Sequence, residues 1–411
     1  TIIIPGPAGP KRIAVKRIWI GALHDKNTHV VAGYSAATTV EPSAAMLEEA
    51  LVEAQTPWKP AKFSIPNLSY LPGAGLPYGA IEGMSPCRPC LITLDNAAQH
   101  FSVRVTNKIR RNLGCSLEYG PIGAWWHNSL IERLFGALEN YGFHRISSST
   151  GTGPSDPLKK NPVARAIRDG IDQTELLEIL DVLFANLNAT PMRSMGNDSP
   201  LALVAAHLSA DPPWLPRPPP PESVFTPMLG ISPEFRPVRG SIKSGKAPYV
   251  QIDEVEYRSP ELSKRYDLIG QNICVHIDEW DMRFTNAYEA KNGNSLGCLV
   301  AQGPWSTTKH TRADRKRINS LRKAGELVLD DGVDPVIVLG QYLTKKAVEE
   351  SRKQKHPSVS KAATELARWS ETTGASLPAP KTIPIEPGKP ATGALPPGIP
   401  HPNWSSVHRN R

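Results

Sequence analysis

The chain has 411 residues, which is too long for a single ordinary hydrophobic core and predicts two or three domains. Its formal net charge of +8 and its pI of about 9.2 favour a polyanionic partner. No apolar run reaches the roughly 18 residues that a membrane-spanning helix needs, and the five cysteines, an odd number, argue against a disulfide framework, so we expect a protein of the reducing cytoplasm with no membrane span.

Two runs of mainly apolar residues, 16–23 and 29–35, predict a β-hairpin near the start of the chain. Asp25 lies in the turn between them and is a candidate catalytic carboxylate. We assign it to the turn instead, because hairpin turns favour Asp and because a turn at the far end of the hairpin is not expected to approach Asp95. A helix over 43–54, with an apolar stripe, is predicted to pack on the resulting sheet.

Residues 58–86 are rich in Gly and Pro and predict a long insertion, for which a functional role and a family-specific elaboration are equally good interpretations. Cys87 and Cys90 follow directly, ahead of a predicted buried strand. A zinc site needs about four ligands, and the sequence offers no second Cys or His pair at a matching distance. We therefore interpret this pair as structural and assign no metal to it.

Asp95 and Glu132 are the candidate catalytic residues. Asp95 ends the apolar run 91–94, which predicts a strand, and Glu132 lies in the first turns of an amphipathic helix. A helix over 102–113 and a strand over 115–119 are predicted between them, so the chain can return the second carboxylate to the first. Divalent metal held beside a phosphodiester can activate the attacking oxygen and neutralise the leaving oxygen. Because hard oxygen ligands suit Mg²⁺, we predict a site for Mg²⁺, or for Mn²⁺ in its place.

His127 and His144 flank the Glu132 helix, and a metal or proton-transfer role is open for both, although a surface or partly packed histidine is the commoner case. A further helix is predicted over 174–186, and the first domain is set at 1–208. Basic side chains around the two carboxylates are predicted to contact DNA. They are Lys108, Arg110, Arg111 and Arg133.

The run 211–221 is dominated by proline and predicts a stiff polyproline linker, which we set at 209–240. Beyond it the chain changes to short alternating runs that are punctuated by glycine. They predict a small antiparallel β-barrel over 241–306. The runs are 249–252, 255–257, 272–277, 286–289 and 296–301.

Residues 311–323 carry six basic residues and one acidic residue. On a helix they would form a strong phosphate-neutralising surface, and a merely solvated helix face is an equal alternative. Helices over 336–354 and 360–370 complete a basic helical region at 307–370. The proline-rich remainder, 371–411, predicts a flexible tail whose scattered apolar residues suit docking to a partner. The DNA-binding candidates of the basic segment are Arg312, Arg315, Lys316, Arg317, Arg322 and Lys323.

Short stretches of the first domain are similar to conserved parts of a known catalytic core. Asp95-Asn96 with Phe101 is similar to a strand end of the form Asp-Asn-Gly-x-x-Phe, although Ala97 replaces the glycine and the phenylalanine comes one residue late. Residues 128–133 are similar to a glutamate-bearing helix start. The stretch 184–201, with Asn188, Pro191 and Pro200, resembles the end of the same domain. These features resemble the catalytic core of the retroviral-integrase superfamily over residues 1 to 204.

A second resemblance lies in the predicted barrel. Residues 255–259, 269–277 and 278–281 are similar to the C-terminal β-domain of Mu-type transposases. An integrase-like core joined to this second domain is typical of the Mu, TnsB and TniA transposase group.

The resemblance implies a fold, an activity and partners. The implied fold is an α/β RNase H-like core followed by a small antiparallel β-barrel and a helical, Pro-rich C-terminal tail. The implied activity is metal-dependent cleavage at transposon ends and transfer of the 3′-hydroxyl strand into target DNA, by a homo-oligomer on DNA. An AAA+ ATPase would dock on the tail, and the protein would lie in a bacterial cytoplasm, associated with the nucleoid.

The family carries two aspartates and a glutamate, and its first aspartate usually lies two residues ahead of a threonine. Thr1 corresponds to that threonine. We therefore expect the first strand and its aspartate to lie upstream and the chain alone to be inactive. Two alternatives stay open: an integrase-fold nuclease that hydrolyses DNA without joining it, and a non-enzymatic scaffold with a degenerate core that binds DNA and docks the ATPase.

Overall fold

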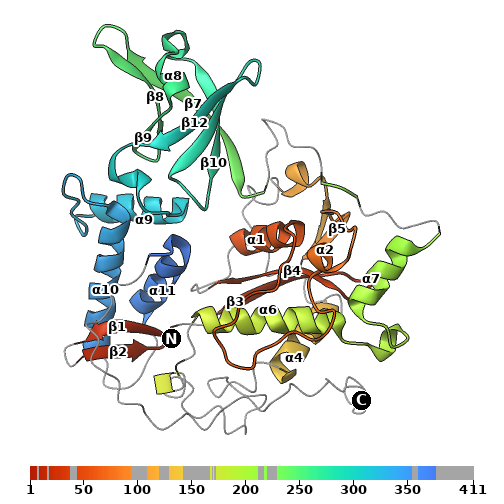
Figure 1. The fold of residues 1–411 in the computed structure, drawn as a ribbon. Helices are drawn as coiled ribbons and strands as arrows, with labels where there is room; N and C mark the ends of the chain where they lie inside the picture. Colours follow the sequence, from red (N-terminus) through yellow and green to blue (C-terminus); the bar gives the residue numbers. More distant parts are fainter. Residues whose placement is uncertain are drawn as a thin grey trace.

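The computed structural model shows an α/β body, a β-barrel and a helical body (Figure 1). The described residues are 1–6, 9–15, 18–37, 44–94, 109–119, 129–141, 167–168, 170, 173–211, 217–219, 229–353 and 360–375. Within these ranges no helix combines the length and the apolar character needed to cross a membrane.

A hairpin of β3 (Trp19–His24) and β4 (Val31–Ala37) lies at the centre of the α/β body, and this confirms the predicted pair of strands. Side chains alternate between the two faces of a strand. On one face α1 (Ala44–Gln55) approaches so closely that a Cβ at Gly33 would collide with the backbone of Ala50. On the other face the neighbouring Tyr34 packs among side chains of α4 (Ser129–Tyr141) and α6 (Gln173–Ala189).

The strand that leads to Asp95 is β5 (Leu91–Leu94), and it pairs in parallel with β6 (Ser116–Tyr119). Parallel neighbours need a crossover connection, and the described part of that connection is helical at 109–112. Ile92, Ile109, Leu113 and Cys115 bury one cluster with Leu51 of α1. The predicted order of strand, helix, strand and helix is therefore confirmed for the described residues.

Residues 57–86 form an ordered loop along α6, with the short helix α2 (Pro77–Ala80) in it. The buried carboxylate of Asp181 accepts hydrogen bonds from Tyr34 Oη at 3.0 Å, from Trp58 Nε1 at 3.1 Å and from Tyr70 Oη. Buried polar groups are costly unless they are paired. The insertion is thus held by specific polar side chains of α6.

Asn188, which the resemblance placed at the end of the core domain, connects α6 to β4 and to the long loop. Its amide accepts from Val31 N at 2.8 Å and donates to Val31 O at 2.9 Å and to Gly75 O at 3.0 Å. It therefore ties the end of α6 to β4 and to the loop. The chain then continues into α7 (Pro200–Ser209), whose first turn is capped by Ser199.

The first strands of the chain lie outside the α/β body. β1 (Ile2–Gly6) and β2 (Gly9–Ile13) form a hairpin, and Ile13 is 3% exposed in a cluster with the C-terminal helices. Residues at the start of the predicted first domain, 1–208, therefore pack with residues more than 300 positions away. Hydrophobic patterning predicts that Ile13 is buried but cannot identify what covers it.

The β-barrel is closed and antiparallel, with the strand order β10-β11-β12-β9-β8-β7. Val250, Tyr257, Val275 and Leu299 are among the side chains of its core. The strands are β7 (Ile231–Ser241), β8 (Lys246–Ile252), β9 (Val255–Arg258), β10 (Asn272–Asp278), β11 (Phe284–Glu289) and β12 (Ser295–Ala301). The predicted barrel and its five alternating runs are confirmed.

The linker predicted at 209–240 is wrong at its end, because β7 occupies Ile231–Ser241. Pro233 and Pro237 concealed this strand, since proline donates no hydrogen bond to a ladder and argues against a strand. In the barrel they lie opposite His276 and Asn272 of β10, and their side chains point to the same side as the exposed Phe235.

The helical body consists of α9 (Arg312–Lys323), α10 (Pro335–Lys353) and α11 (Lys361–Thr373). α9 begins at Thr311 with a capping box to Asp314. Trp369 of α11 lies against Gly340 of α10, where a Cβ would collide with the indole ring. The helices predicted in this region are confirmed, and the tail beyond residue 375 lies outside the described residues.

Candidate functional site

The two carboxylates proposed for catalysis differ in how far the structure describes them. Glu132 is exposed in the first turn of α4, where negative charge suits the helix dipole. Asp95 lies outside the described residues, as do Lys108, His127 and His144. The structure does describe β5, which ends just before Asp95, and α4, which carries Glu132. The residues that contact these two elements indicate how near they lie to each other.

The turn between β3 and β4 is built around Asp25. Its Oδ2 accepts from Asn27 N at 3.1 Å, from Thr28 N at 2.7 Å and from Thr28 Oγ1 at 2.8 Å. Such bonds to the following backbone are what makes Asp favourable in turns. They support the assignment of Asp25 to turn chemistry.

The same turn lies beside the end of β5. Lys26 Nζ donates to Thr93 Oγ1 at 2.8 Å, and Thr93 Oγ1 donates to Glu118 Oε2 of β6 at 3.0 Å. Thr93 is two residues before Asp95 in the chain. The Lys26 side chain of this turn therefore reaches the strand that leads to Asp95. Asp95 itself lies outside the described residues, so the expectation that the turn does not approach it stays a prediction.

The turn also lies close to the start of α4. His24 Nε2 is 3.0 Å from His29 O, and the two rings are 5.5 Å apart. Burial lowers the pKa of His24 to about 4, with a smaller contribution from the charge of His29 and the smallest from Arg133. Burial also lowers the pKa of His29, and the next contribution is the charge of Arg133. Val31 of β4 and Leu134 of α4 are buried in one cluster, so α4 packs on this hairpin.

Arg88, between Cys87 and Cys90, attaches this segment to the end of the crossover helix. Its Nη1 donates to Leu113 O at 2.6 Å and to Gly114 O at 3.0 Å, which satisfies carbonyls at the end of the crossover helix. Cys87 is half-buried and Cys90 is exposed, and both are free thiols. Burial raises the pKa of Cys87, and the charge of Asp25 adds to this. Among the described residues, to which Asp95 does not belong, no group of three or more His, Cys, Asp or Glu side chains is placed to hold a metal ion.

The basic segment 311–323 is helical, but two of its arginines are buried at the base of the barrel. Arg312 is 4% exposed and pairs with Glu234 at 2.7 Å, with Asp253 at 2.7 Å and with Glu279 at 3.2 Å. Its charge is therefore used inside the protein. A buried and paired guanidinium is not available to a DNA phosphate, so Arg312 is no longer a candidate DNA contact.

Arg315 is fully buried and joins the helical body to the barrel. Its guanidinium lies over the rings of Trp305 and Tyr257, and it donates to the hydroxyl of Tyr257, to Met282 O at 3.0 Å and to His310 Nε2. Burial lowers the pKa of His310 to about 4, and the charge of Arg315 adds to this. The imidazole is thus neutral and can accept from Arg315. Because Arg315 is buried, it is also no longer a candidate DNA contact.

The other cations of α9 remain on the surface, and most of them are paired. Arg317 pairs with Glu365 at 2.8 Å, while Arg322 and Lys323 both pair with Glu254. Lys316 is exposed and has no ion pair within the described chain. The capping box of Thr311 and Asp314 could have been read from the sequence as a helix start. The count of charged residues does not show which arginines of this helix are buried.

Arg110, Arg111 and Arg133 keep the exposure that a DNA contact needs. The Nε of Arg133 donates to Ser129 O at 3.1 Å, which leaves its other nitrogens for a ligand or solvent. These three arginines remain candidates for phosphate contact.

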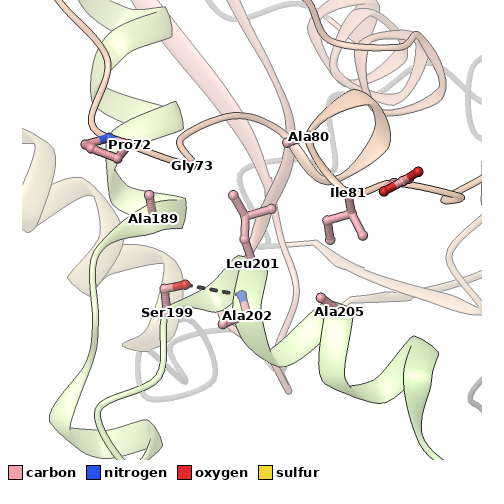
Figure 2. Close-up of a pocket in the computed structure, with 10 residues that line it drawn as sticks. Pro72, Gly73, Ala80, Ile81, Ala189, Ser199, Leu201, Ala202 and Ala205 are labelled. Atoms are coloured by element: carbon pink, nitrogen blue, oxygen red, sulfur yellow. Dashed lines mark hydrogen bonds between the residues drawn. The ribbon is translucent and has the colours of Figure 1, made fainter.

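A shallow cavity of about 360 Å³ lies between α7 and the 72–82 part of the long loop (Figure 2). Its lining includes Pro72, Ile81, Leu201 and Ala205, and Glu82 is the one charged residue among its lining residues within the described chain. This lining offers no set of groups for acid–base or nucleophilic chemistry. Comparison with known protein families and with curated proteins gives no match to this chain.

Proposed function

We propose that this chain carries the catalytic core of a DDE-type DNA transposase of the retroviral-integrase superfamily. The single observation that carries the proposal is the position of the β3–β4 turn. Lys26 of this turn bonds to Thr93, two residues before Asp95. Val31, just after the turn, is buried in one cluster with Leu134, two residues after Glu132. A shared neighbour favours the convergence of Asp95 and Glu132.

In this proposal Asp95 and Glu132 hold Mg²⁺, and the carboxylate oxygens of both residues suit that ion. When bound, the metal would neutralise charge on the reacting phosphodiester. The side chains of the protein position the DNA: Arg110, Arg111 and Arg133 are exposed and would contact its phosphates. Lys26 bonds to Thr93 and so links the turn to β5.

The order of strands and helices along the chain supports the proposal. The hairpin β3–β4, the parallel pair β5–β6 and the helix α4 follow one another as the resemblance implies, and a closed barrel comes after the α/β body. The RNase H-like character of the α/β body belongs to the proposal. So does an AAA+ ATPase that docks on the tail.

The test is Asp95→Ala in the complete protein, assayed on a transposon-end duplex. We expect the loss of both strand cleavage and joining, with end binding unchanged, because the substitution removes a metal ligand and no phosphate contact. Glu139→Ala on the exposed side of α4 is the control and should keep both activities. Retained cleavage in Asp95→Ala would refute the assignment, and cleavage by the wild type without joining would make the protein a nuclease.

A further inference from the structure

The β7–β8 hairpin carries basic side chains at the end of the barrel that is remote from α9. At the α9 end, Glu234 of β7 and Asp253 after β8 both bind Arg312. The turn at 242–245 joins the opposite ends of the same two strands (Figure 1). This hairpin is therefore clear of the contact between the barrel and the helical body.

Cations and one aromatic ring gather on the outer face of β7, β8 and β9. Arg239 lies opposite Tyr249 in the register of β7 and β8. Lys246 Nζ lies 4.2 Å from the centre of the Tyr249 ring, and Arg258 lies 5.3 Å from it. Lys243 is exposed in the turn. A tyrosine ring attracts cations to its face, so Tyr249 holds Lys246 and Arg258 in place beside it.

The negative charge on this face is small. Glu256 pairs with Lys246 at 2.8 Å and with Arg258 at 2.9 Å, and hydrogen bonds from Lys246 and then Arg258 hold its pKa below the usual range. Arg239 bonds to the neutral Gln251, and Lys243 has no ion pair within the described chain. The face thus keeps an excess of positive charge at neutral pH, unlike α9, whose charge is largely paired.

The tip of the hairpin adds an apolar side chain. Ile242 is 72% exposed and lies next to Lys243. A two-stranded β-ribbon fits the major groove of duplex DNA, and many DNA-binding proteins place cations on phosphates and insert an apolar side chain into the minor groove. An acidic polypeptide would match the cations but gives no reason for an apolar tip between them.

We propose that the β7–β8 hairpin is a duplex-DNA contact, with Arg239 and Lys243 on phosphates and Ile242 in a groove. The proposal rests on the proposed function only for the identity of the polyanion. It places the DNA-binding surface of the C-terminal half on the barrel and not on α9.

The test measures binding of a fluorescein-labelled duplex of about 30 base pairs to the full chain, between about 50 and 200 mM salt and with chelator present. The double variant Arg239→Gln/Lys243→Gln should weaken binding by about tenfold and reduce the slope of log K against log salt by roughly 2, because each phosphate contact contributes about 0.9. Lys291→Gln, which removes an exposed lysine from the β11–β12 turn across the barrel, is the matched control and should change neither.

Ile242→Ser separates the groove contact from the phosphate contacts. It should weaken binding several-fold and leave the salt slope unchanged, since no charge is removed. An unchanged slope in the double variant, or an equal loss in Lys291→Gln, would overturn the proposal. Competition by polyglutamate that depends on Arg239 and Lys243 while DNA binding does not would assign the face to an acidic polypeptide and would also overturn it.

Two further measurements keep the result interpretable. Far-UV circular dichroism and the melting temperature report whether the double variant is folded, and Lys243→Gln alone, in a solvent-exposed turn, replaces it otherwise. Binding is measured without divalent metal, and cleavage is tested separately with Asp95→Ala. Loss of one activity therefore does not imply loss of the other.

Discussion

His24 and His310 are held neutral in different parts of the chain, and burial is the main cause in both. His24 closes the β3–β4 turn, and His310 accepts from the buried Arg315. The pKa of each is lowered to about 4, whereas a histidine in an unfolded chain titrates near 6.5. The unfolded state therefore binds more protons than the folded state between these two values, and stability must fall as the pH falls through that window.

The pH dependence of unfolding tests this at His24. The wild-type free energy of unfolding should be greatest above about pH 6.5 and should decrease towards pH 4, with roughly 3 kcal/mol of the decrease due to His24 alone. His24→Gln removes this proton and should make the decrease shallower by up to about 1.4 kcal/mol per pH unit. Urea unfolding at several pH values is the measurement, and equal slopes in wild type and variant would contradict the account.

Asp25 shows what residue-level reasoning can and cannot predict. Its part in the turn follows from the short-range chemistry of Asp, Asn and Thr, and the bonds to Asn27 and Thr28 agree with it. The bond from Lys26 to Thr93 does not follow from local sequence, because it depends on how two strands separated by 66 residues are placed.

At the scale of elements, α9 is the joint between the barrel and the helical body. A charge count over 311–323 predicts a helix with a basic face, and charge alone cannot distinguish a solvated arginine from a buried one. Arg312 pairs with carboxylates from β7, from the β8–β9 turn and from the segment after β10. Those carboxylates are far apart in the sequence, so their meeting point could not be predicted before the barrel was known.

Arg312→Ala tests this joint. The substitution leaves Glu234, Asp253 and Glu279 close together without their shared cation, and breaking a buried pair in this way costs about 3 to 5 kcal/mol. Lys316→Ala on the exposed face of the same helix should change stability by less than about 0.5 kcal/mol. Denaturant unfolding of the full chain compares the two, and similar losses would show that the pairing of Arg312 is not what fixes α9.

Predicted and observed elements agree where patterning is strong and disagree where proline interferes. Burial alternates along β4, β8 and β9, and the apolar runs of β3 and β5 likewise made these strands predictable. β7 was missed because Pro233 and Pro237 argue against a strand, although a closed barrel accommodates them. For the candidate site, the sequence predicted a carboxylate after a strand, Asp95, and a carboxylate at a helix start, Glu132. It did not predict which other residues lie around them.

At the scale of the whole molecule, the two ends of the described chain pack together. Ile13 of β2 is buried with Leu339, Leu366 and Trp369 of the C-terminal helices. On the same hairpin, Arg12 Nη1 donates to Ile167 O at 3.3 Å. The β1–β2 hairpin thus packs on the C-terminal helices, and contacts between such distant segments are not encoded in any local pattern.

Ile13→Ala tests the contribution of the hairpin to the helical body. A cavity at a buried isoleucine costs about 2 to 5 kcal/mol, and the loss should appear in the unfolding of the C-terminal helices. Ile3→Ala on the same hairpin is the control, because Ile3 is 45% exposed and should cost far less. A destabilisation by Ile3→Ala as large as that of Ile13→Ala would contradict the packing described.

The central claim is that Asp95 and Glu132 converge on one metal ion, and Mn²⁺ binding measured by electron paramagnetic resonance tests it most directly. The complete protein on a transposon-end duplex should bind Mn²⁺, and Asp95→Asn and Glu132→Gln should each weaken that binding by at least about tenfold, since the site depends on few carboxylates. Glu139→Gln, further along α4, should bind as the wild type does. Undiminished Mn²⁺ binding in either Asp95→Asn or Glu132→Gln would contradict the account.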